Sequence, residues 1–487
     1  MAKKEVKVTE EQKKETKTAK TIQAKEKVTA KATTEKKPAT KKTETEKKPE
    51  KKTATEKSGK KDAEKKVSEK KTSEKNVSEK KTTGKKIDKK IAEAPEIAAG
   101  DLKFDVTPVK SVLFVASEAN PYLGSGGLAD VIGSLPKTLA ANGKYDVRVV
   151  MPLYGDISDK YRSQMRFLMN FNVSLAWRNQ YCGVFSLKAD GVTFYFIDNE
   201  YYFKRSGLYG FYDDGERFAY FSKAALEMMV HLDYYPEILH CHDWQTALSV
   251  VYLKTLYANR YGYDHIKALF TIHNIEYQGK YGYDCLGDLF GLPESVKPAL
   301  DYDGCLNLMK GAIQFSDRFS TVSRMYANEI KNPFFAHGLQ YAICENEFKL
   351  TGILNGIDET VYNPETDEKL FRNYSADDTS GKAVCKKELQ KMLGLPEKDD
   401  APLISIISRL VPAKGLDLVK CVIEELLAEN VQVVILGKGE GDYEDYFRML
   451  ADRYSGKCRA IIAYNKDLAS KIYSASDIFL MPSKQEP

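Results

Sequence analysis

Short apolar runs alternate with amphipathic helical patterns along most of the chain, and this alternation limits the possible fold more than any other feature. The runs are apolar on both faces, which is typical of buried strands in a parallel sheet. Five of them form a first series, at residues 111–117, 146–152, 238–242, 268–273 and 318–323. Residues 192–198 and the segment FNVSLAW are expected to add a hairpin. The pattern predicts an α/β fold.

A second series of apolar runs follows a polar stretch that extends from Asn363 to about residue 400. Its members lie at residues 403–408, 431–437, 459–464 and 477–483. In the first series, the apolar residues of 128–139 follow helical spacing, and Pro136 is expected to kink or restart that helix. Two doubly wound sheets in tandem, with a cleft at their carboxyl edges, explain both series most simply.

The first 100 residues differ sharply from the rest of the chain. They hold 32 lysines, no arginine and 18 acidic residues, a net charge of +14, whereas the remaining residues carry −9. They contain no aromatic residue, and residues 66–85 form a degenerate five-residue repeat. Such a segment buries too little apolar surface to offset its ordering entropy, so we expect a disordered, solubilising tail over residues 1–105. Weak, salt-sensitive contact with polyanions and a targeting role are the alternatives.

The spacing of the cysteines and the hydropathy of the chain predict the cellular compartment. Eight cysteines lie beyond the tail without CxxC pairs or zinc-like spacing, which is typical of reduced thiols in a cytoplasmic enzyme. No run approaches 18 consecutive apolar residues, so we expect no membrane span. Nothing in the pattern indicates specific nucleic-acid binding.

The segment GSGGLA carries the most specific local signal. Gly124, Gly126 and Ala129 satisfy a dinucleotide-binding pattern. However, six residues separate the preceding strand from Gly124, and the second strand ends in Met-Pro rather than in an acidic residue. A dehydrogenase is therefore disfavoured. Gly126 and Gly127 still open a helix whose free N–H groups would suit a phosphate, although glycines used only for packing are the alternative.

His242 ends a predicted strand in the segment HCHDW, so its imidazole should point into the cleft. A lone histidine is more often structural, but its position beside Asp243 and Trp244 favours a function. His240 and His242 suggest a metal pair. We expect their side chains to face opposite sides of the strand, and therefore not to share an ion.

Seven segments occur in the order found in one enzyme family. They are SEANPYLGSGGLADVIGSLP, LHCHDWQTA, FTIHNIEYQGKYG, STVSRMYANEI, ILNGID, ISRLVPAKGLDLV and ASDIFLMPSKQEP. From about residue 110 onward the chain resembles the bacterial glycogen synthases and plant starch synthases of glycosyltransferase family 5. The resemblance implies a GT-B fold, two Rossmann-like domains facing across a cleft. It also implies retaining, metal-independent and cofactor-free transfer of glucose from ADP-glucose to the non-reducing end of an α-1,4-glucan such as glycogen.

The resemblance also assigns roles to residues. His242 would support the transferring glucose, and Glu486 would steady the donor and the cationic sugar. The remaining matched residues would bind the donor (Gly126, Gly127, Arg409, Lys414 and Tyr464) or line the glucose and acceptor sites (Asp130, Asn274 and Asn355). Arg409 and Lys414 would hold the diphosphate, and Tyr464 would pack on the adenine.

One departure bears on the donor. The family usually has lysine where this chain has Gly124, so the turn keeps its amides and loses a cation. Donor affinity and the choice between ADP-glucose and UDP-glucose are therefore open, and we expect Gly124→Lys to tighten ADP-glucose binding. A non-catalytic glucan-binding or scaffold protein is the alternative function.

The predicted domains are the tail at 1–105, an N-terminal Rossmann-like domain at 106–358, a linker at 359–400 and a C-terminal Rossmann-like domain at 401–487. Only four strands are expected after residue 400, whereas a full Rossmann-like domain has about six. We therefore expect the second domain to be incomplete and the chain to be a C-terminally truncated enzyme, of reduced activity.

Overall fold

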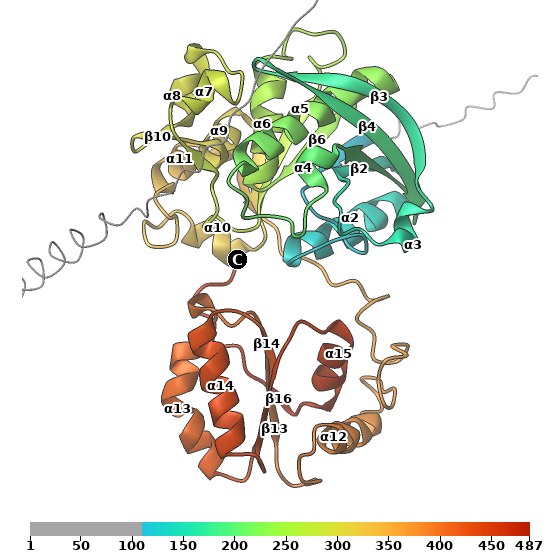
Figure 1. Cartoon of the computed structure of the whole chain (residues 1–487), viewed down its shortest axis with the longest axis vertical. Helices are drawn as coiled ribbons and strands as arrows, with labels where there is room; N and C mark the ends of the chain where they lie inside the picture. The colour runs from blue at the N-terminus through green and yellow to red at the C-terminus, as the bar shows by residue number, and fades with distance from the viewer. Residues whose placement is uncertain (1–109) are drawn as a thin grey trace, which may run out of the picture. The chain divides into compact units, whose positions relative to one another are not determined.

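The computed structural model describes residues 110–487, so the predicted tail at 1–105 lies outside the described residues. The described chain forms two α/β bodies, each with its own sheet and core (Figure 1). This agrees with the two tandem sheets predicted from the apolar runs.

The first body is built on a nine-stranded sheet with the order β12-β11-β7-β6-β1-β2-β5-β4-β3. Its strands are β1 (Lys110–Val115), β2 (Tyr145–Pro152), β3 (Arg166–Leu175), β4 (Arg178–Ala189), β5 (Val192–Asp198), β6 (Ile238–His242), β7 (Lys267–Ile272), β11 (Arg318–Thr321) and β12 (Leu350–Gly352). The strands from β12 to β5 pair in parallel. Their buried valines, isoleucines and phenylalanines explain the continuous apolar runs in the sequence.

Several helices of the first body pack on this sheet, and others pack on those helices. The helices of the first body are α2 (Gly127–Ala141), α3 (Asp159–Arg162), α4 (Glu200–Phe203), α5 (Asp214–Leu232), α6 (Trp244–Lys254), α7 (Cys285–Asp288), α8 (Lys297–Leu300), α9 (Leu308–Phe315), α10 (Arg324–Glu329) and α11 (Gln340–Glu345), with the 3-10 turns η1 (Glu294–Val296) and η2 (Glu347–Lys349). A small antiparallel sheet joins β8 (Lys280–Tyr281), β10 (Cys305–Asn307) and β9 (Asp301–Tyr302). Helix α2 runs through the buried Pro136 without a restart.

The antiparallel part of the first sheet differs from the expected hairpin. FNVSLAW belongs to β3, which pairs with β4, and β4 in turn pairs with β5. Residues 192–198 form β5 as predicted, but β5 also pairs in parallel with β2. Strand β4 was not predicted, because it carries polar residues at many positions and lacks a continuous apolar run.

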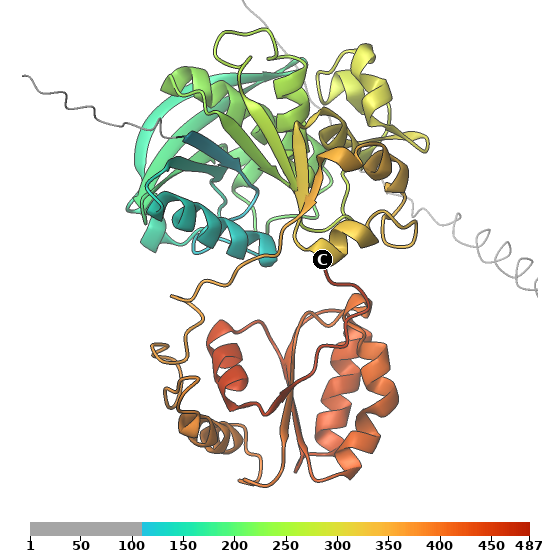
Figure 2. The same ribbon diagram turned by 180° about the vertical axis from the view of Figure 1, so that it is seen from behind.

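The second body has a four-stranded parallel sheet with the order β15-β14-β13-β16. Its strands are β13 (Leu403–Ile407), β14 (Gln432–Gly437), β15 (Cys458–Ile462) and β16 (Ile478–Phe479), and its helices are α12 (Ser380–Met392), α13 (Leu416–Ala428), α14 (Gly441–Arg453) and α15 (Lys466–Ala475), with the turn η3 (Pro412–Lys414). Helices α13 and α14 cover one face of the sheet, and α12 and α15 cover the other (Figures 1 and 2).

Helix α12 lies inside the stretch 359–400 that was predicted as a linker. Its Cys385 and Leu389 are fully buried and pack with Leu468 and Ile472 of α15. Part of this stretch therefore contributes to the core of the second body.

Candidate active site

Most of the candidate residues of the first body follow the carboxyl ends of its parallel strands. His242 ends β6, Asn274 follows β7, and the glycine turn connects β1 to α2. Strands β1, β6 and β7 are neighbours in the sheet, so these residues come to the same edge. Ligands of open α/β sheets bind at this edge.

The glycine turn presents an open helix N-terminus. Gly126 caps α2, and Gly127 is its first residue, as predicted. A Cβ atom built on either glycine would meet no atom within 4 Å. The first turn of α2 can therefore be approached closely by a ligand, and the helix dipole favours an anion there.

Gly124 has a different reason to be glycine. A Cβ atom at this position would collide with the Cβ atom of Ala129 and lie 3.1 Å from the Oδ1 atom of Asn120. A lysine cannot be placed there unless the turn moves. Our expectation that Gly124→Lys would simply restore a phosphate contact is therefore wrong for this backbone.

Glu118, which the sequence reasoning did not single out, lies directly behind the turn. Its side chain is 3 % exposed, and its Oε2 atom accepts a hydrogen bond from the backbone N–H of Ser125 at 2.6 Å. Burial raises the pKa of this carboxyl group. The signal in the sequence was an acidic residue three positions after a buried strand.

Three histidines gather at the ends of β6 and β7. The ring centroids of His240 and His242 are 4.1 Å apart, so the expectation that they face opposite sides was wrong. Residues two apart on a strand share a face. Within residues 110–487, no group of three or more His, Cys, Asp or Glu side chains could hold a metal ion.

His242 is fully buried and joined to His273, a residue that the sequence reasoning missed. The Nδ1 atom of His242 lies 3.0 Å from the Nε2 atom of His273, and Phe114 stacks on the His242 ring at 5.7 Å. The Nε2 atom of His242 has no hydrogen-bond partner among the described residues. A buried polar atom of this kind is costly unless a ligand pairs with it.

The histidine rings are uncharged at neutral pH. Burial lowers the pKa of His240 to about 3 and that of His273 to about 4, and it lowers the pKa of His242 well below the ordinary value. A neutral imidazole has one N–H and one acceptor nitrogen. The hydrogen bond between His242 and His273 therefore fixes whether the unpaired Nε2 atom of His242 donates or accepts.

Asp243 follows β6 and has a strained backbone conformation, and its side chain links the end of β6 to the end of β7. Its φ is +56° and its ψ is 179°, a region that residues other than glycine rarely adopt. Its Oδ1 atom accepts the backbone N–H of His273 at 2.7 Å. Strain of this kind persists where the surrounding structure imposes it, and it clusters at functional sites.

The ionisation of Asp243 gives a prediction for stability. Burial raises its pKa from an ordinary 3.8 to about 7 in the folded protein. Between these values the folded protein holds a proton that the unfolded chain has lost, so this group lowers the free energy of unfolding as pH rises. Asp243→Asn should therefore gain stability relative to wild type from about pH 4 to about pH 7. Urea unfolding at several pH values measures the free energies of unfolding of the variant and the wild type. A difference between the two that does not change with pH would contradict the prediction.

The other candidate residues of the first body lie around this edge. The Oδ1 atom of Asp130 accepts a hydrogen bond from the amide of Asn120 at 2.6 Å. The Oδ1 atom of Asn274 accepts the backbone N–H of Glu276 at 2.9 Å. Asn355 is exposed in the stretch after β12. The structure therefore brings Asn274 beside the histidines and leaves Asn355 without a fixed partner among the described residues.

In the second body the structure joins two predicted residues that are far apart in the sequence. The ammonium group of Lys414 forms an ion pair with Glu486, whose Oε1 atom also accepts a hydrogen bond from the Ser483 hydroxyl at 2.7 Å. Gly415 makes this possible, because its φ is +66° and a Cβ atom there would collide with the carbonyl oxygen of Pro482. Arg409 follows β13, and Tyr464 follows β15 with 74 % of its side chain exposed.

Comparisons with known proteins show the family of the chain. The family model described as "Starch synthase catalytic domain" matches residues 111–345, and "Glycosyl transferases group 1" matches residues 389–487. The chain is 49 % identical to a glycogen synthase of Clostridium acetobutylicum over 77 % of its own length and 79 % of that protein. It is 48 % identical to a glycogen synthase of Streptococcus agalactiae, with the same shares covered. The chain belongs to the glycogen synthase and starch synthase family.

A solved structure extends the comparison to the fold of this family member. The catalytic domain of starch synthase IV from Arabidopsis thaliana, bound to ADP and acarbose, matches with a TM-score of 0.72 and 33 % identity. The match covers 78 % of this chain and 79 % of that one. The predicted GT-B fold and the prediction of a glycosyltransferase are confirmed.

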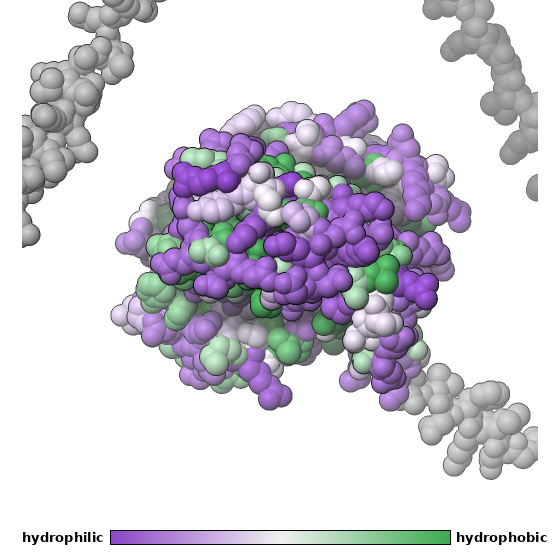
Figure 3. Space-filling model, turned by 90° about the horizontal axis from the view of Figure 1, so that it is seen from below, coloured by the Kyte–Doolittle hydropathy of each residue, from purple (hydrophilic) through white to green (hydrophobic). Residues whose placement is uncertain are grey.

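The helices and the surface of this glycosyltransferase bear on the expectation that the chain has no membrane span. Among the described residues, no helix combines the length and the hydropathy that a bilayer crossing requires. Figure 3 shows one face, on which hydrophilic residues predominate and apolar residues form separate small areas. Scattered apolar residues of this kind are normal on protein surfaces.

Proposed function

We propose that the chain transfers glucose, with retention, from ADP-glucose to the non-reducing end of an α-1,4-glucan in the cytoplasm. One observation carries the proposal. Among residues 110–487, the Nε2 atom of the fully buried His242 has no hydrogen-bond partner, and it lies at the sheet edge that also holds an open helix N-terminus. A polar sugar beside a phosphate would satisfy both features.

The donor is held by charge and by backbone groups in this proposal. The backbone N–H groups of the open turn at Gly126 and Gly127 donate hydrogen bonds to a phosphate oxygen, and Arg409 and Lys414 supply cations for the diphosphate. These cations stabilise the negative charge that develops as the glucosyl bond breaks. The exposed ring of Tyr464 provides a surface for the adenine.

The transferring glucose contacts uncharged and acidic groups. The Nε2 atom of His242 hydrogen-bonds a glucose hydroxyl, and Glu486 faces the positive charge that develops on the sugar. Asp130, Asn274 and Asn355 line the glucose and acceptor sites. The resemblance to the family supports each of these roles, and the starch synthase IV structure supports a nucleotide and a glucan-like ligand because its own ligands are ADP and acarbose.

A transfer assay tests the proposal. The chain is incubated with glycogen and either labelled ADP-glucose or labelled UDP-glucose, and polymer-bound label is counted. We expect incorporation from ADP-glucose to exceed that from UDP-glucose. A larger incorporation from UDP-glucose would replace the proposed donor, and glycogen binding without transfer from either donor would favour a non-catalytic glucan-binding protein.

Lys414→Ala is expected to weaken donor binding more than acceptor binding. A charged hydrogen bond contributes about 1.5–3 kcal/mol. The ion pair that Lys414 already makes with Glu486 offsets part of this, so the KM for ADP-glucose should rise by up to about tenfold while the KM for glycogen changes little. Initial rates at varied donor and acceptor concentrations measure both. Lys398→Ala, on an exposed loop, is the matched control. A defect confined to the acceptor would contradict the role of Lys414.

A further inference from the structure

Strand β3 forms one edge of the nine-stranded sheet, and among the described residues it pairs only with β4. It is ten residues long, about twice the usual length of a strand, and it lies on the outside of the first body (Figures 1 and 2). An edge of this length exposes a row of backbone N–H and C=O groups to which another chain can pair. Natural proteins usually carry a device that prevents such pairing.

Most of these protective devices are missing from β3. Residues 167–175 contain no charged side chain and no proline. A β-bulge lies between Phe167 and Met169, but the pairing with β4 is regular from Met169 to Leu175. The segment from Met169 to Leu175 is therefore a regular, uncharged stretch of edge that is open to another strand.

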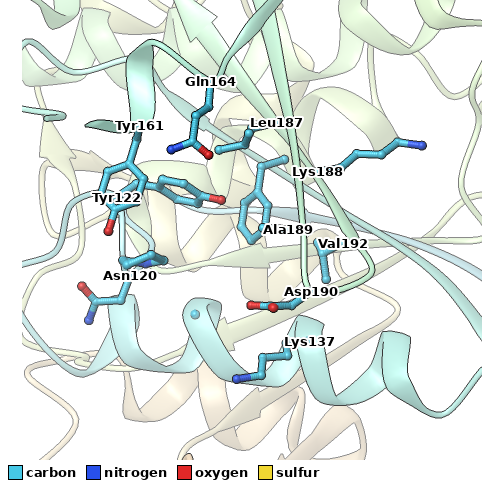
Figure 4. Close-up of a pocket in the computed structure, with 13 residues that line it drawn as sticks. Asn120, Tyr122, Lys137, Tyr161, Gln164, Leu187, Lys188, Ala189, Asp190 and Val192 are labelled. Atoms are coloured by element: carbon cyan, nitrogen blue, oxygen red, sulfur yellow. The ribbon is translucent and has the colours of Figure 1, made fainter. Parts of the chain in front are cut away.

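The other end of the hairpin is covered by helices of the same body (Figure 4). Leu187 and Ala189 of β4 line a pocket of about 130 Å³ together with Lys137 of α2 and Tyr161 of α3. Side chains of α2 and α3 therefore lie against this end of β4. The open part of the hairpin is the free side of β3.

The free backbone groups of β3 belong to alternate residues. Leu175 and Arg178 flank the two-residue turn of the hairpin, and a pair in this position is hydrogen-bonded. Hydrogen-bonded and non-hydrogen-bonded pairs alternate along an antiparallel ladder, so the N–H and C=O groups of Asn170, Asn172 and Ser174 point away from β4. The side chains of these three residues are exposed. They can therefore bond to a strand on the free side.

The segment from Met169 to Leu175 is complementary to a second copy of itself. In an antiparallel pair about a two-fold axis at Asn172, each residue meets the residue that is equally far from the axis on the other chain. Asn172 meets Asn172, and Asn170 meets Ser174. Amides and hydroxyls both donate and accept hydrogen bonds, so these side chains suit each other. The outward backbone groups would add about six hydrogen bonds.

The opposite face of the segment is apolar and is only partly covered by its own chain. Val173 and Leu175 are buried. Met169 and Phe171 are half-buried, and Phe171 stacks on His231 of α5 with ring centroids 4.1 Å apart. In the two-fold pairing, Phe171 meets Val173 of the other copy, an aromatic and β-branched pair of the kind that stabilises sheets. Met169 meets Leu175. The pairing would thus bury apolar surface that one copy leaves open.

We propose that β3 is the interface of a two-fold dimer, in which two copies of the chain join their sheets by antiparallel pairing about Asn172. A second copy fits this edge because self-pairing about an axis requires a segment that does not bring like charges opposite each other, and residues 167–175 meet this requirement. The proposal does not depend on the proposed function, because the interface involves no substrate.

Charges introduced at the axis test the pairing. Asn172→Lys places two ammonium groups directly opposite each other in the dimer, and Asn172→Glu places two carboxylates there. Size-exclusion chromatography with light scattering gives the mass of each full-length protein over a range of concentrations. We expect a dimeric wild type and a dissociation constant that is raised by about tenfold or more in each variant. An equimolar mixture of the two variants should form dimers again, because opposite charges then meet at the axis.

Asn179→Lys is the matched control. It adds the same charge to the same face of the hairpin, but on β4 and away from the free edge, so it should remain dimeric. Thermal unfolding shows that each variant is folded.

Three outcomes would overturn the proposal. The first is a wild type that stays monomeric up to its highest soluble concentration. The second is dimerisation by Asn172→Lys and Asn172→Glu that is as strong as in the wild type, because the interface would then lie elsewhere. The third is a mixture of the two variants that stays monomeric, because residue 172 would then not meet its own copy. A monomeric wild type whose retardation by glycogen is lost in Asn172→Lys would also give this edge to a polysaccharide instead of a second copy.

Discussion

His242→Ala is expected to lower kcat by about fivefold to a hundredfold, because the variant loses the proposed hydrogen bond to the transferring sugar, which would be worth about 1–3 kcal/mol. The substitution also affects stability, because His242 is fully buried and pairs with His273. Alanine would leave a cavity and an unpaired Nε2 atom on His273, so the variant should also unfold more readily.

His242→Asn separates the two effects. The asparagine amide lies about where the Nδ1 atom of His242 lies and can bond to His273, so the melting temperature should lie closer to that of the wild type than that of His242→Ala. This variant should still turn over slowly, because asparagine has no atom at the position of Nε2. His265→Ala, at a half-exposed side chain in a loop, is the matched control. Wild-type turnover in a folded His242→Asn or His242→Ala variant would remove His242 from the site.

Gly124→Lys is expected to damage the protein rather than to improve donor binding. The Cβ atom of any residue at position 124 would collide with Ala129, and Ala129 belongs to the first turn of α2. Overpacking of this kind costs about 1–3 kcal/mol. We expect a lower melting temperature and a higher KM for ADP-glucose, because the displaced turn no longer presents its N–H groups to the phosphate.

Two alanine variants show whether the backbone is the cause. Gly124→Ala carries the same colliding Cβ atom without a charge, so it should be destabilised about as much as Gly124→Lys. Gly127→Ala meets no atom within 4 Å, so its melting temperature should match the wild type. Thermal unfolding of the four proteins makes the comparison. Tighter ADP-glucose binding by a stable Gly124→Lys protein would show that the turn adapts and that a cation was missing.

The sequence predicted the parallel strands well because their physical cause is local. Strands buried on both faces must be apolar throughout, and that pattern is visible in β1, β2, β6, β7, β13 and β14. Strand β4 was missed because its polar and apolar residues follow no continuous run. Helix α12 was hidden in a polar stretch because only a few of its residues, such as Leu389, are buried.

The candidate site was predicted only in part, for a related reason. His242 and the glycine turn have recognisable sequence contexts, so they were identified. His273, Glu118 and the strain at Asp243 depend on which strands become neighbours and on how loops close, and no local pattern encodes these. Strand geometry alone predicts that His240 and His242 point to the same face, because residues two positions apart on a strand share a face. Our prediction of opposite faces was therefore wrong.

The ion pair between Lys414 and Glu486 reduces the electrostatic free energy that a donor diphosphate can gain at Lys414. The ammonium group already has a counter-ion in the folded chain. A diphosphate that arrives there exchanges one anion for another, so the electrostatic gain is a difference between two partners and not the full attraction of a free cation. In the proposed function, the same exchange would free the Glu486 carboxylate from Lys414 when the donor binds. Donor binding and the availability of Glu486 would then be coupled through one exchange of counter-ions.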